Sequence, residues 1–331
     1  MKKFIIMLIT IVLIGIGASY FYIQRLQTIN KGDNYLIIKE ESSLESLAKQ
    51  LEDKSIIKSK DIFLMYTKLN KFNSNIKSSK LIIKQGTSYK ELISKLKTGK
   101  SDFSIVTIPE GFTLYQIGER LEKDTTINKE SLLKINISDL TSNNIVAKKP
   151  NTYYDLEGFL YPDTYYIPVD ATEKDIAKLM FSRFKSIMSD EYINRAKELD
   201  LDINEVITIA SLIEKEAAND SERSKIAGVI YNRIKKGMPL QVDASVIYAN
   251  TKGKKIMQKV TYNDLKIQDL YNTYVYKELP PGPIASPGKA SIEAALYPEN
   301  HDYLYYVANG KGHVFSKTYS EHLNNVKKYI K

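Results

Sequence analysis

The residues best placed to do chemistry are two glutamates, Glu214 and Glu216, in an otherwise apolar, helix-forming run over residues 209–218. Residues three and four apart share a helix face, so Glu214 has only small neighbours, whereas Glu216 points to a different face. A carboxyl group with such room for a ligand could act as a general acid/base. The alternative is an ordinary amphipathic helix whose glutamates face water, and the spacing alone favours that alternative. The small neighbours are Ala210, Ser211, Ala217 and Ala218.

Other polar residues are candidates for ligand binding. Gln241 and Asp243 alternate after a turn, so they could face one side of a strand, the alternative being a routine half-exposed strand. Residues 155–167 are aromatic and turn-rich, and form either scaffold or cleft wall, because tyrosines stack on sugars but also fill cores. Residues 279–288 contain four prolines and two glycines and predict a rigid loop. The candidate side chains in the last two segments are Glu157, Tyr161, Asp163 and Ser286.

The N-terminus indicates where the protein is located. Residues 4–23 carry no charge and are long enough to span a bilayer. A cleaved signal peptide is the alternative, but the apolar run exceeds a usual signal core and residues 15–19 form a poor cleavage site. Lys2 and Lys3 favour a cytoplasmic N-terminus. We therefore expect a single-pass cell-membrane anchor, with the rest of the chain outside the cytoplasm.

The composition predicts a folded extracytoplasmic part without disulfides. Hydrophobic residues make up 43% of the 331 residues, which supports a sizeable core in two or more domains, and cysteine is absent. A net charge of +9 suits an anionic membrane surface or cell-wall polymer. The lysines are spread out and form no nucleic-acid-binding motif, which argues against nucleic acid as a partner. No metal or other cofactor is expected, because His301, His313 and His322 lack paired ligand spacing.

A pattern of strand, polar turn and amphipathic helix recurs over residues 35–51, 81–96 and 104–121. A further helix over residues 60–69 makes residues 35–84 read as strand, helix, helix, strand. This order resembles LysM modules, which hold glycans containing N-acetylglucosamine; a small α+β spacer is the alternative. Asn204 is the expected N-cap of the helix that carries Glu214. Helices are also expected over residues 173–189, 190–199, 221–235 and 319–331, and strands over 303–308 and 313–316.

Several segments together resemble the endolytic murein transglycosylase (YceG-like) family of membrane-anchored bacterial enzymes, which cut peptidoglycan glycan strands. The resemblance covers nearly the whole chain, with two departures: Ser286 stands where the family pattern suggests Asn, and the turn at residues 309–313 is one glycine short. The motifs that carry it are Pro109-Glu110-Gly111, the runs at residues 156–165 and 210–216, Asn232-Arg233, the run at 237–243, Tyr271-Asn272-Thr273-Tyr274, and the runs at 279–288 and 313–318.

The resemblance implies an α+β protein in three parts: a cytoplasmic tip, transmembrane anchor and linker over residues 1–30, a LysM-like module over 31–100, and a mixed α/β catalytic domain over 101–331. It implies that Glu214 is the single essential acid/base, on a helix, while Glu216 only supports the site. Cell-wall synthases are expected partners besides the glycan strands and the membrane. The residues expected to bind substrate are Gln241, Asp243, Tyr274, Ser286, Glu157, Tyr161 and Asp163.

The implied reaction cleaves the β-1,4 bond between N-acetylmuramic acid and N-acetylglucosamine without water and leaves a 1,6-anhydro end, trimming nascent strands. Two alternatives stay open. A non-catalytic glycan-binding scaffold would not need an acid in a cleft of small residues. A lysozyme-type hydrolase would need a second carboxylate near the first, and Asp243 is the candidate for it.

Overall fold

The chain forms two compact units, Met1–Ser104 and Ile105–Lys331. This computed structural model describes residues 2–39, 42–72, 76–140, 145–146, 148–255, 257 and 259–330; Met1 and Lys331, which open and close the predicted domain ranges, lie outside that part. Helices and short two-stranded sheets make up both units, so the predicted α+β class is confirmed. The domain boundaries expected after residues 30 and 100 stay predictions.

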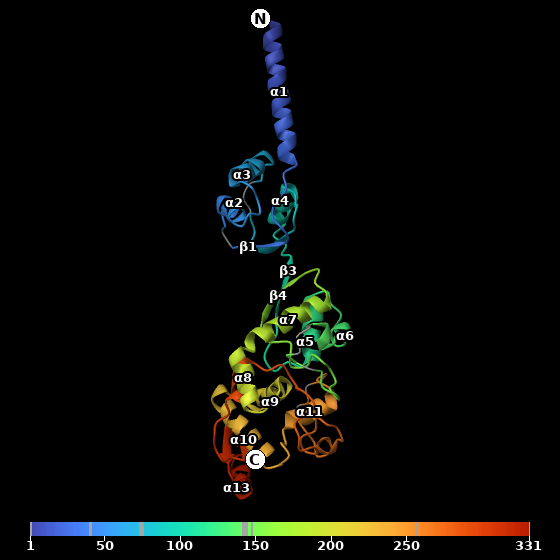
Figure 1. Ribbon diagram of the computed structural model, residues 1–331, viewed down its shortest axis with the longest axis vertical. Helices are drawn as coiled ribbons and strands as arrows, with labels where there is room; N and C mark the ends of the chain where they lie inside the picture. Colours follow the sequence, from blue (N-terminus) through green and yellow to red (C-terminus); the bar gives the residue numbers. More distant parts are fainter. Residues whose placement is uncertain are drawn as a thin grey trace. The chain divides into compact units, whose positions relative to one another are not determined.

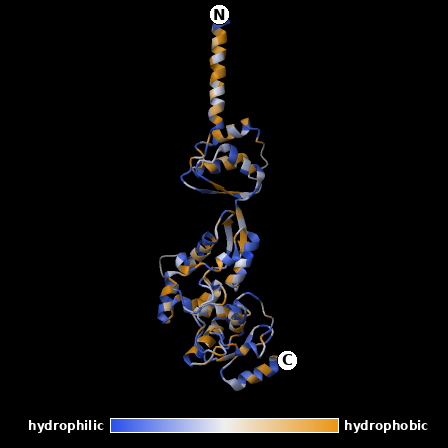
Figure 2. Cartoon of the chain, turned by 90° about the vertical axis from the view of Figure 1, so that its right-hand side faces the viewer, coloured by the Kyte–Doolittle hydropathy of each residue, from blue (hydrophilic) through white to orange (hydrophobic). Residues whose placement is uncertain are grey.

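The first helix, α1 (Lys2–Gln24), is long and apolar enough to cross a membrane. Figure 2 shows it coloured as predominantly hydrophobic, and none of its residues is buried in the protein. A helix that exposes apolar side chains all round requires an apolar surrounding, which a bilayer provides. The predicted apolar span is therefore present as a helix, and its orientation in a membrane stays a prediction.

The rest of the first unit has the predicted order of strand, helix, helix, strand and helix (Figure 1). The strands β1 (Asn34–Ile38) and β2 (Ser79–Ile83) pair antiparallel, with the fully buried Leu36 opposite the fully buried Leu81. Each helix begins after a serine whose hydroxyl accepts a hydrogen bond from the backbone N–H three residues later, as N-cap residues do. The helices are α2 (Leu44–Asp53) after Ser43, α3 (Lys60–Leu69) after Ser59 and α4 (Tyr89–Thr98) after Ser88.

The strand β3 (Phe103–Thr107) leads into the second unit and pairs with β4 (Thr164–Pro168) in a two-stranded sheet. The sequence did not predict β4, because it lies within the turn-rich aromatic segment at residues 155–167. The helices α7 and α8 agree closely with those expected over residues 173–189 and 190–199. The helical elements of this part are α5 (Leu114–Asp124), α6 (Lys129–Leu132), η1 (Ile137–Asp139), α7 (Glu173–Ile187) and α8 (Asp190–Glu198).

The helix α9 (Ile203–Glu216) is the central element of the second unit. All its residues up to Ile213 are buried except Glu205, so it is a core helix rather than an amphipathic surface helix. Its N-cap is Asp202, which forms a capping box with Glu205, and not Asn204, which is buried inside the first turn. The expected cap was wrong by two residues because both side chains can cap and only tertiary packing fixes the start.

The C-terminal elements pack around α9. The helices α10, α11 and α12 contact it directly, and α13 packs on an antiparallel hairpin of β5 and β6. No strand forms at residues 241–243, because Gln241 has a positive φ of 54° and α11 begins at Asp243. The elements are η2 (Asp220–Glu222), α10 (Arg223–Lys235), α11 (Asp243–Thr251), η3 (Asp264–Lys266), α12 (Lys289–Leu296), β5 (Tyr305–Ala308), β6 (His313–Ser316) and α13 (Tyr319–Tyr329).

Gly158 joins the 155–167 segment to the proline-rich loop, and its replacement by alanine should destabilise the fold. Its φ is +82°, and a Cβ atom would lie 2.5 Å from Cβ of Pro283 and 3.1 Å from Cγ2 of Ile207. Backbone strain and overpacking together should cost about 2 to 4 kcal/mol. Gly237, with a φ of +62° and no atom within 4 Å, is the matched control. Chemical unfolding measures the loss of folding free energy, and equal losses for G158A and G237A would contradict this packing.

Candidate active site

Glu214 lies in the last turn of α9 with its side chain 8% exposed. Three donors from other elements reach one oxygen, Oε2. The backbone N–H of Gly288 donates at 3.1 Å, the hydroxyl of Ser291 at 2.8 Å and the guanidinium of Arg223 at 3.2 Å. Every hydrogen bond that the described residues give to this carboxyl group ends on Oε2. The carboxyl group is thus fixed through one oxygen, which leaves Oε1 for a ligand.

The proline-rich loop at residues 279–288 follows α9 toward Glu214. The hydroxyl of Ser211 donates to the carbonyl of Thr208 at 2.7 Å and accepts from the backbone N–H of Ile284 at 3.1 Å. One helical turn further on, Gly288 reaches Glu214. The space next to the small residues Ala210 and Ser211, which are fully buried, is therefore filled by a loop of the protein itself.

A second carboxyl group, that of Glu110, lies beside the first. Gly111 donates its N–H to the carbonyl of Ser286 at 2.8 Å, and Ser286 donates its N–H to the carbonyl of Phe112 at 2.8 Å. This pairing places Glu110 so close to Gly288 that a Cβ atom on Gly288 would lie 2.0 Å from the Glu110 carboxyl carbon. Both carboxyl groups therefore lie next to Gly288, where a side chain would require the exposed Glu110 side chain to move.

The electrostatics of the two carboxyl groups differ. Glu110 is exposed as a residue, but partial desolvation of its carboxyl group raises its pKa, the neighbouring Glu214 raises it further, and Arg223 opposes the rise. Glu214 instead forms an ion pair with Arg223, whose side chain is 11% exposed and also bridges Asp220 at 2.9 Å. Sequence reasoning used Glu110 only as part of a motif and did not select it as a site residue, because its contact with Gly288 joins distant parts of the chain.

Glu216 belongs to a separate polar cluster on another side of α9. Its carboxylate accepts a hydrogen bond from the Tyr306 hydroxyl at 3.0 Å, and burial raises its pKa. Asp243, a charged neighbour of Glu216, accepts from the Tyr274 hydroxyl at 2.6 Å. Gln241 is the third predicted residue in this cluster, through a 3.3 Å hydrogen bond from the Arg233 guanidinium. The structure thus brings together Gln241, Asp243, Tyr274 and Glu216, as a group apart from the Glu214 network.

Two of the predicted binding residues are buried. Glu157 is 2% exposed and accepts hydrogen bonds from the Leu114 N–H and the Tyr248 hydroxyl, each at 2.8 Å. Ser286 is fully buried, and its backbone, not its side chain, holds the Glu110 segment. Both side chains are therefore buried in this structure, and their predicted role in substrate binding stays a prediction.

The remaining predicted residues lie near Glu110. Tyr161 is largely buried and close enough to Glu110 for the two groups to interact electrostatically, and the guanidinium of Arg183 covers its ring. Asp163 forms an ion pair with Arg183 at 2.7 Å, while its backbone carbonyl accepts from Ile108 at 2.9 Å. Tyr161 can therefore contribute to the cleft wall, whereas Asp163 fixes the segment behind it.

Two pockets border the Glu214 network through its direct neighbours. One, of about 600 Å³, is lined by Arg223 together with Asp220, Lys289 and Tyr297. The other, of about 320 Å³, is lined by Lys215, Glu216 and Asp243 among others. No group of three His, Cys, Asp or Glu side chains among the described residues is placed to hold a metal ion.

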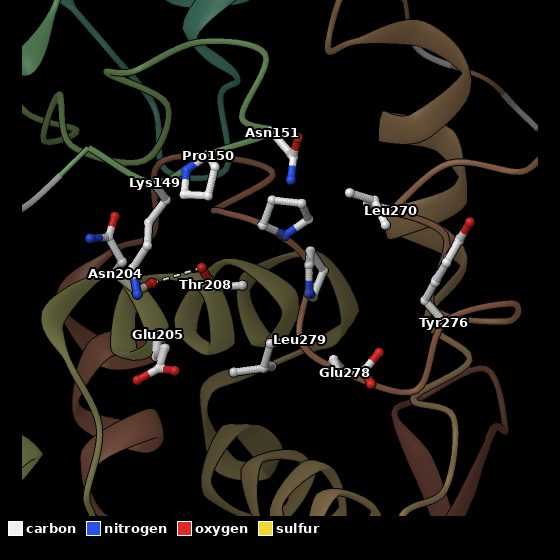
Figure 3. A pocket seen from close by; sticks show the side chains of 12 residues that line it. Lys149, Pro150, Asn151, Asn204, Glu205, Thr208, Leu270, Tyr276, Glu278 and Leu279 are labelled. Carbon is white, nitrogen blue, oxygen red and sulfur yellow. Dashed lines mark hydrogen bonds between the residues drawn. The ribbon is translucent and has the colours of Figure 1, made fainter.

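A third pocket, of about 360 Å³, lies beside the N-terminal half of α9 (Figure 3). Thr208, Glu205 and Leu279 line it, and Figure 3 draws the Thr208 hydroxyl donating to the Asn204 carbonyl. Asn204 precedes Glu214 by about 15 Å of helix axis. This pocket is therefore remote from the two carboxyl groups and their donors.

The model of the YceG-like family matches residues 36–328, nearly the whole chain. The chain belongs to the YceG-like family. The endolytic murein transglycosylase of Bacillus subtilis is 35% identical over 334 residues, which covers 95% of this chain and 91% of that protein. The protein of the same name from Streptococcus pneumoniae (strain D39) is 32% identical, and the alignment covers 88% of this chain but 58% of that longer protein.

A solved structure supports the same family membership. The crystal structure of a YceG-like protein from Listeria monocytogenes is similar to this one with a TM-score of 0.61 and 33% sequence identity. The similarity covers 89% of this chain and 99% of that protein. The family predicted from the motifs is therefore confirmed.

Glu157 should make the stability of the protein depend on pH. Burial raises its pKa from the usual 4.5 to about 7, so between these values the folded state binds more protons than the unfolded state. Stability should then fall by about 3 kcal/mol as the pH rises from 4.5 to 7. Chemical unfolding of the full chain in detergent at several pH values tests this, with E157Q expected to flatten the dependence. If the stability of E157Q falls as steeply with rising pH, another titrating group causes the pH dependence.

Proposed function

We propose that this chain is a membrane-anchored endolytic lytic transglycosylase of peptidoglycan. It cleaves the β-1,4 bond between N-acetylmuramic acid and N-acetylglucosamine without consuming water, and so trims or terminates nascent glycan strands. The observation that carries the proposal is the fixation of Glu214 through Oε2 alone, in a chain of the YceG-like family. The names of the relatives support the same substrate and reaction.

The reaction needs one group that first donates and then accepts a proton. Protonated Oε1 of Glu214 donates to the glycosidic oxygen, the 4-oxygen of N-acetylglucosamine, as its bond to C1 of the muramic acid breaks. Positive charge then develops at C1. The Glu214 carboxylate next removes the proton from the muramic 6-hydroxyl, whose oxygen bonds to C1. The products are a 1,6-anhydromuramic end and a free 4-hydroxyl, and Glu214 regains its proton.

The donors on Oε2 suit this double role. Gly288 and Ser291 fix the carboxyl group in one orientation, so Oε1 meets the leaving oxygen and the 6-hydroxyl without reorganisation. The guanidinium of Arg223 stabilises the carboxylate that forms after the first step. Each of these contacts acts on the same oxygen, so the reactive oxygen keeps its freedom to exchange the proton.

The two pockets that border the network are where we place the glycan. A strand cut internally continues on both sides of the bond that breaks, so an endolytic site requires two binding regions. The pocket of Arg223, Asp220 and Tyr297 takes one side, and the pocket of Lys215 and Asp243 takes the other. Tyr297 is 43% exposed and can stack on a sugar ring, and the charged side chains can pair with the peptides attached to the strand.

The first unit is proposed to be a LysM-like glycan-holding module. Its order of β1, α2, α3 and β2, with the strands paired, supports this proposal. Such a module would raise the local concentration of glycan near the membrane. Cell-wall synthases also act near the membrane, and we propose them as partners only because of this shared location.

A lysozyme-type hydrolase is the second candidate, because Glu110 provides another carboxyl group beside Glu214. Such an enzyme would use that group as nucleophile or base and leave reducing ends. Mass spectrometry of digested glycan strands separates the candidates, since anhydro ends support the transglycosylase, reducing ends the hydrolase, and uncut strands a scaffold.

Glu214→Gln should abolish cleavage while the protein stays folded. Glutamine keeps the hydrogen bonds to Oε2 but cannot transfer the proton, and loss of an acid/base group costs about a hundred- to ten-thousand-fold in rate. Because one group serves both steps, we expect the upper end of that range. Formation of anhydro ends from purified strands is the measurement.

Glu216→Gln is the matched control, two residues away on the same helix. Its hydrogen bond to Tyr306 can be kept by the amide, so activity should fall far less. If E216Q is inactive while E214Q is nearly normal, the acid/base is Glu216 and the proposal has chosen the wrong glutamate. If both variants keep their activity, the mechanism with a single acid/base fails.

The absence of cysteine in the chain allows a direct test of topology. With single cysteines introduced at Lys2 and at Lys31, a membrane-impermeant thiol reagent should label only K31C in intact cells. K2C should react once the cells are permeabilised, because Lys2 lies on the cytoplasmic side of α1. Labelling of K2C in intact cells would show that the N-terminus lies outside the cell, opposite to the proposed orientation. Release of K31C as a soluble, shortened chain would indicate a cleaved signal peptide.

A further inference from the structure

The chain passes from α1 straight into the folded part of the first unit, residues 26–98. Just after the helix, the Leu26 carbonyl accepts a hydrogen bond from the Tyr89 N–H at 3.0 Å. Two residues later, the Thr28 N–H donates to the Thr87 carbonyl at 2.8 Å, and the Thr28 side chain is buried. Leu26 also packs against the hydrophobic core of this unit. The end of α1 is therefore fixed to the folded part by backbone pairing and by packing.

The helix α3 lies beside the end of α1. The side-chain amide of Gln24, the last residue of α1, donates to the side chain of Asn70 at 3.4 Å and accepts from the Tyr66 hydroxyl at 3.4 Å. Asn70 is the C-cap of α3. Figure 1 shows α3 level with this end of α1, and β1 at the far end of the unit.

The length of α1 places this contact at the edge of a bilayer. Residues 4–23 carry no charge and rise about 30 Å as a helix, which is the thickness of the hydrocarbon core. Gln24 then lies at the outer boundary of the hydrocarbon. Because Gln24 is hydrogen-bonded to the C-terminal end of α3, that end of α3 lies at the same boundary.

The helix α3 exposes an apolar stripe, formed by Ile62, Met65 and Leu69. Their exposed fractions are 37%, 44% and 48%. Residues three and four apart share one face of a helix, so these side chains form one continuous patch. Phe63 and Tyr66, on another face of the same helix, are buried in the core. The stripe is therefore not needed to hold α3 in its unit and is left for another apolar surface.

Basic side chains accompany the stripe. Lys60, Lys68 and Lys71 lie in α3 or directly after it and are all exposed, while Asp61 is the acidic residue of this helix. An apolar stripe with lysines on the polar face is typical of helices that lie in the interface of a membrane. Lysines near the bilayer surface are attracted to anionic lipid headgroups. Both the stripe and the charges of α3 thus match a lipid surface.

We propose that α3 lies on the outer surface of the bilayer, with the stripe at the boundary of headgroups and acyl chains and the three lysines among anionic headgroups. This inference rests on the membrane anchoring in the proposed function and adds a second contact to it. A single spanning helix leaves the unit free to rotate about the helix axis, whereas a second contact fixes which face is turned to the lipid. The sheet of β1 and β2 then points away from the membrane, where a glycan strand can reach it.

The absence of cysteine lets a single fluorescent label report on one position. The full chain with Met65→Cys, labelled with the fluorophore NBD, is placed in nanodiscs of phosphatidylcholine and phosphatidylglycerol. Some of the lipids carry a nitroxide near the headgroup, which quenches fluorescence at short range. A helix in the interface lies about 5 to 10 Å deep, so the M65C label should lose about half of its fluorescence or more. Without phosphatidylglycerol the loss should be smaller, because the lysines lose their anionic partners.

Two labelled positions serve as controls. Ile37→Cys is the matched control, since Ile37 is also apolar and is 52% exposed, on the outward face of β1 at the far end of the unit. Its label should keep its fluorescence. Phe21→Cys, at a 58% exposed position of α1, reports on the anchor itself and should be quenched.

A substitution in the stripe tests whether it makes the contact. Leu69→Glu adds a carboxylate at an exposed position, so the fold should persist while quenching of the M65C label falls toward that of I37C. Ser46→Glu adds the same charge at an exposed position of α2 and should leave the quenching unchanged. Equal quenching with and without L69E would show that the stripe does not hold α3 on the lipid, and would refute the inference.

The outcomes separate this inference from the anchoring on which it rests. If the F21C label is quenched while M65C is quenched no more than I37C, the anchor holds and the inference is refuted. If F21C is not quenched, α1 does not enter the bilayer, and the anchoring in the proposed function fails together with the inference. If the M65C emission shifts to shorter wavelength without quenching by the lipid, protein covers the stripe instead, which also refutes the inference.

Discussion

One constraint governs the site: the proline-rich loop at residues 279–288 is tied to α9 and cannot move independently of it. Two of its backbone N–H groups donate hydrogen bonds to the side chains of Ser211 and Glu214, which are one helical turn apart. On its other side the loop pairs with Gly111 and Phe112 through Ser286. Because prolines restrict its backbone further, the loop holds the backbone next to Glu110 and the carboxyl group of Glu214 in one arrangement.

The same arrangement explains why buried polar residues surround an apolar helix. The Ser211 hydroxyl accepts a hydrogen bond from the loop, and the Ser291 hydroxyl donates one to Glu214. The Glu157 carboxylate accepts hydrogen bonds from the first N–H of α5 and from the Tyr248 hydroxyl. Each of these contacts joins segments that are far apart in the chain. A buried polar group left without a partner costs about 1 to 3 kcal/mol, so these pairs select one arrangement of the loops over its alternatives.

The sequence predicted the features that depend on local signals. Helices with serine N-caps, such as α2 and α4, begin within the expected residues, because the cap and the apolar spacing both lie in the segment itself. The strand at Gln241 and the cap at Asn204 were wrong because tertiary contacts decided between local options. Glu110 could not be selected as a site residue, since nothing near it in the chain indicates that Gly288 leaves space for its carboxyl group.

The position of the ion pair on its helices has a consequence for stability. Glu214 lies in the last turn of α9, where the helix dipole is negative, and Arg223 is the first residue of α10, where the dipole is positive. Both charges occupy the helix ends that suit them least, at about 0.3 to 1 kcal/mol each. The backbone thus weakens an ion pair that the side chains strengthen. The ion pair therefore depends on the side-chain contacts of Glu214 and Arg223, and each helix would be more stable with the opposite charge at that end.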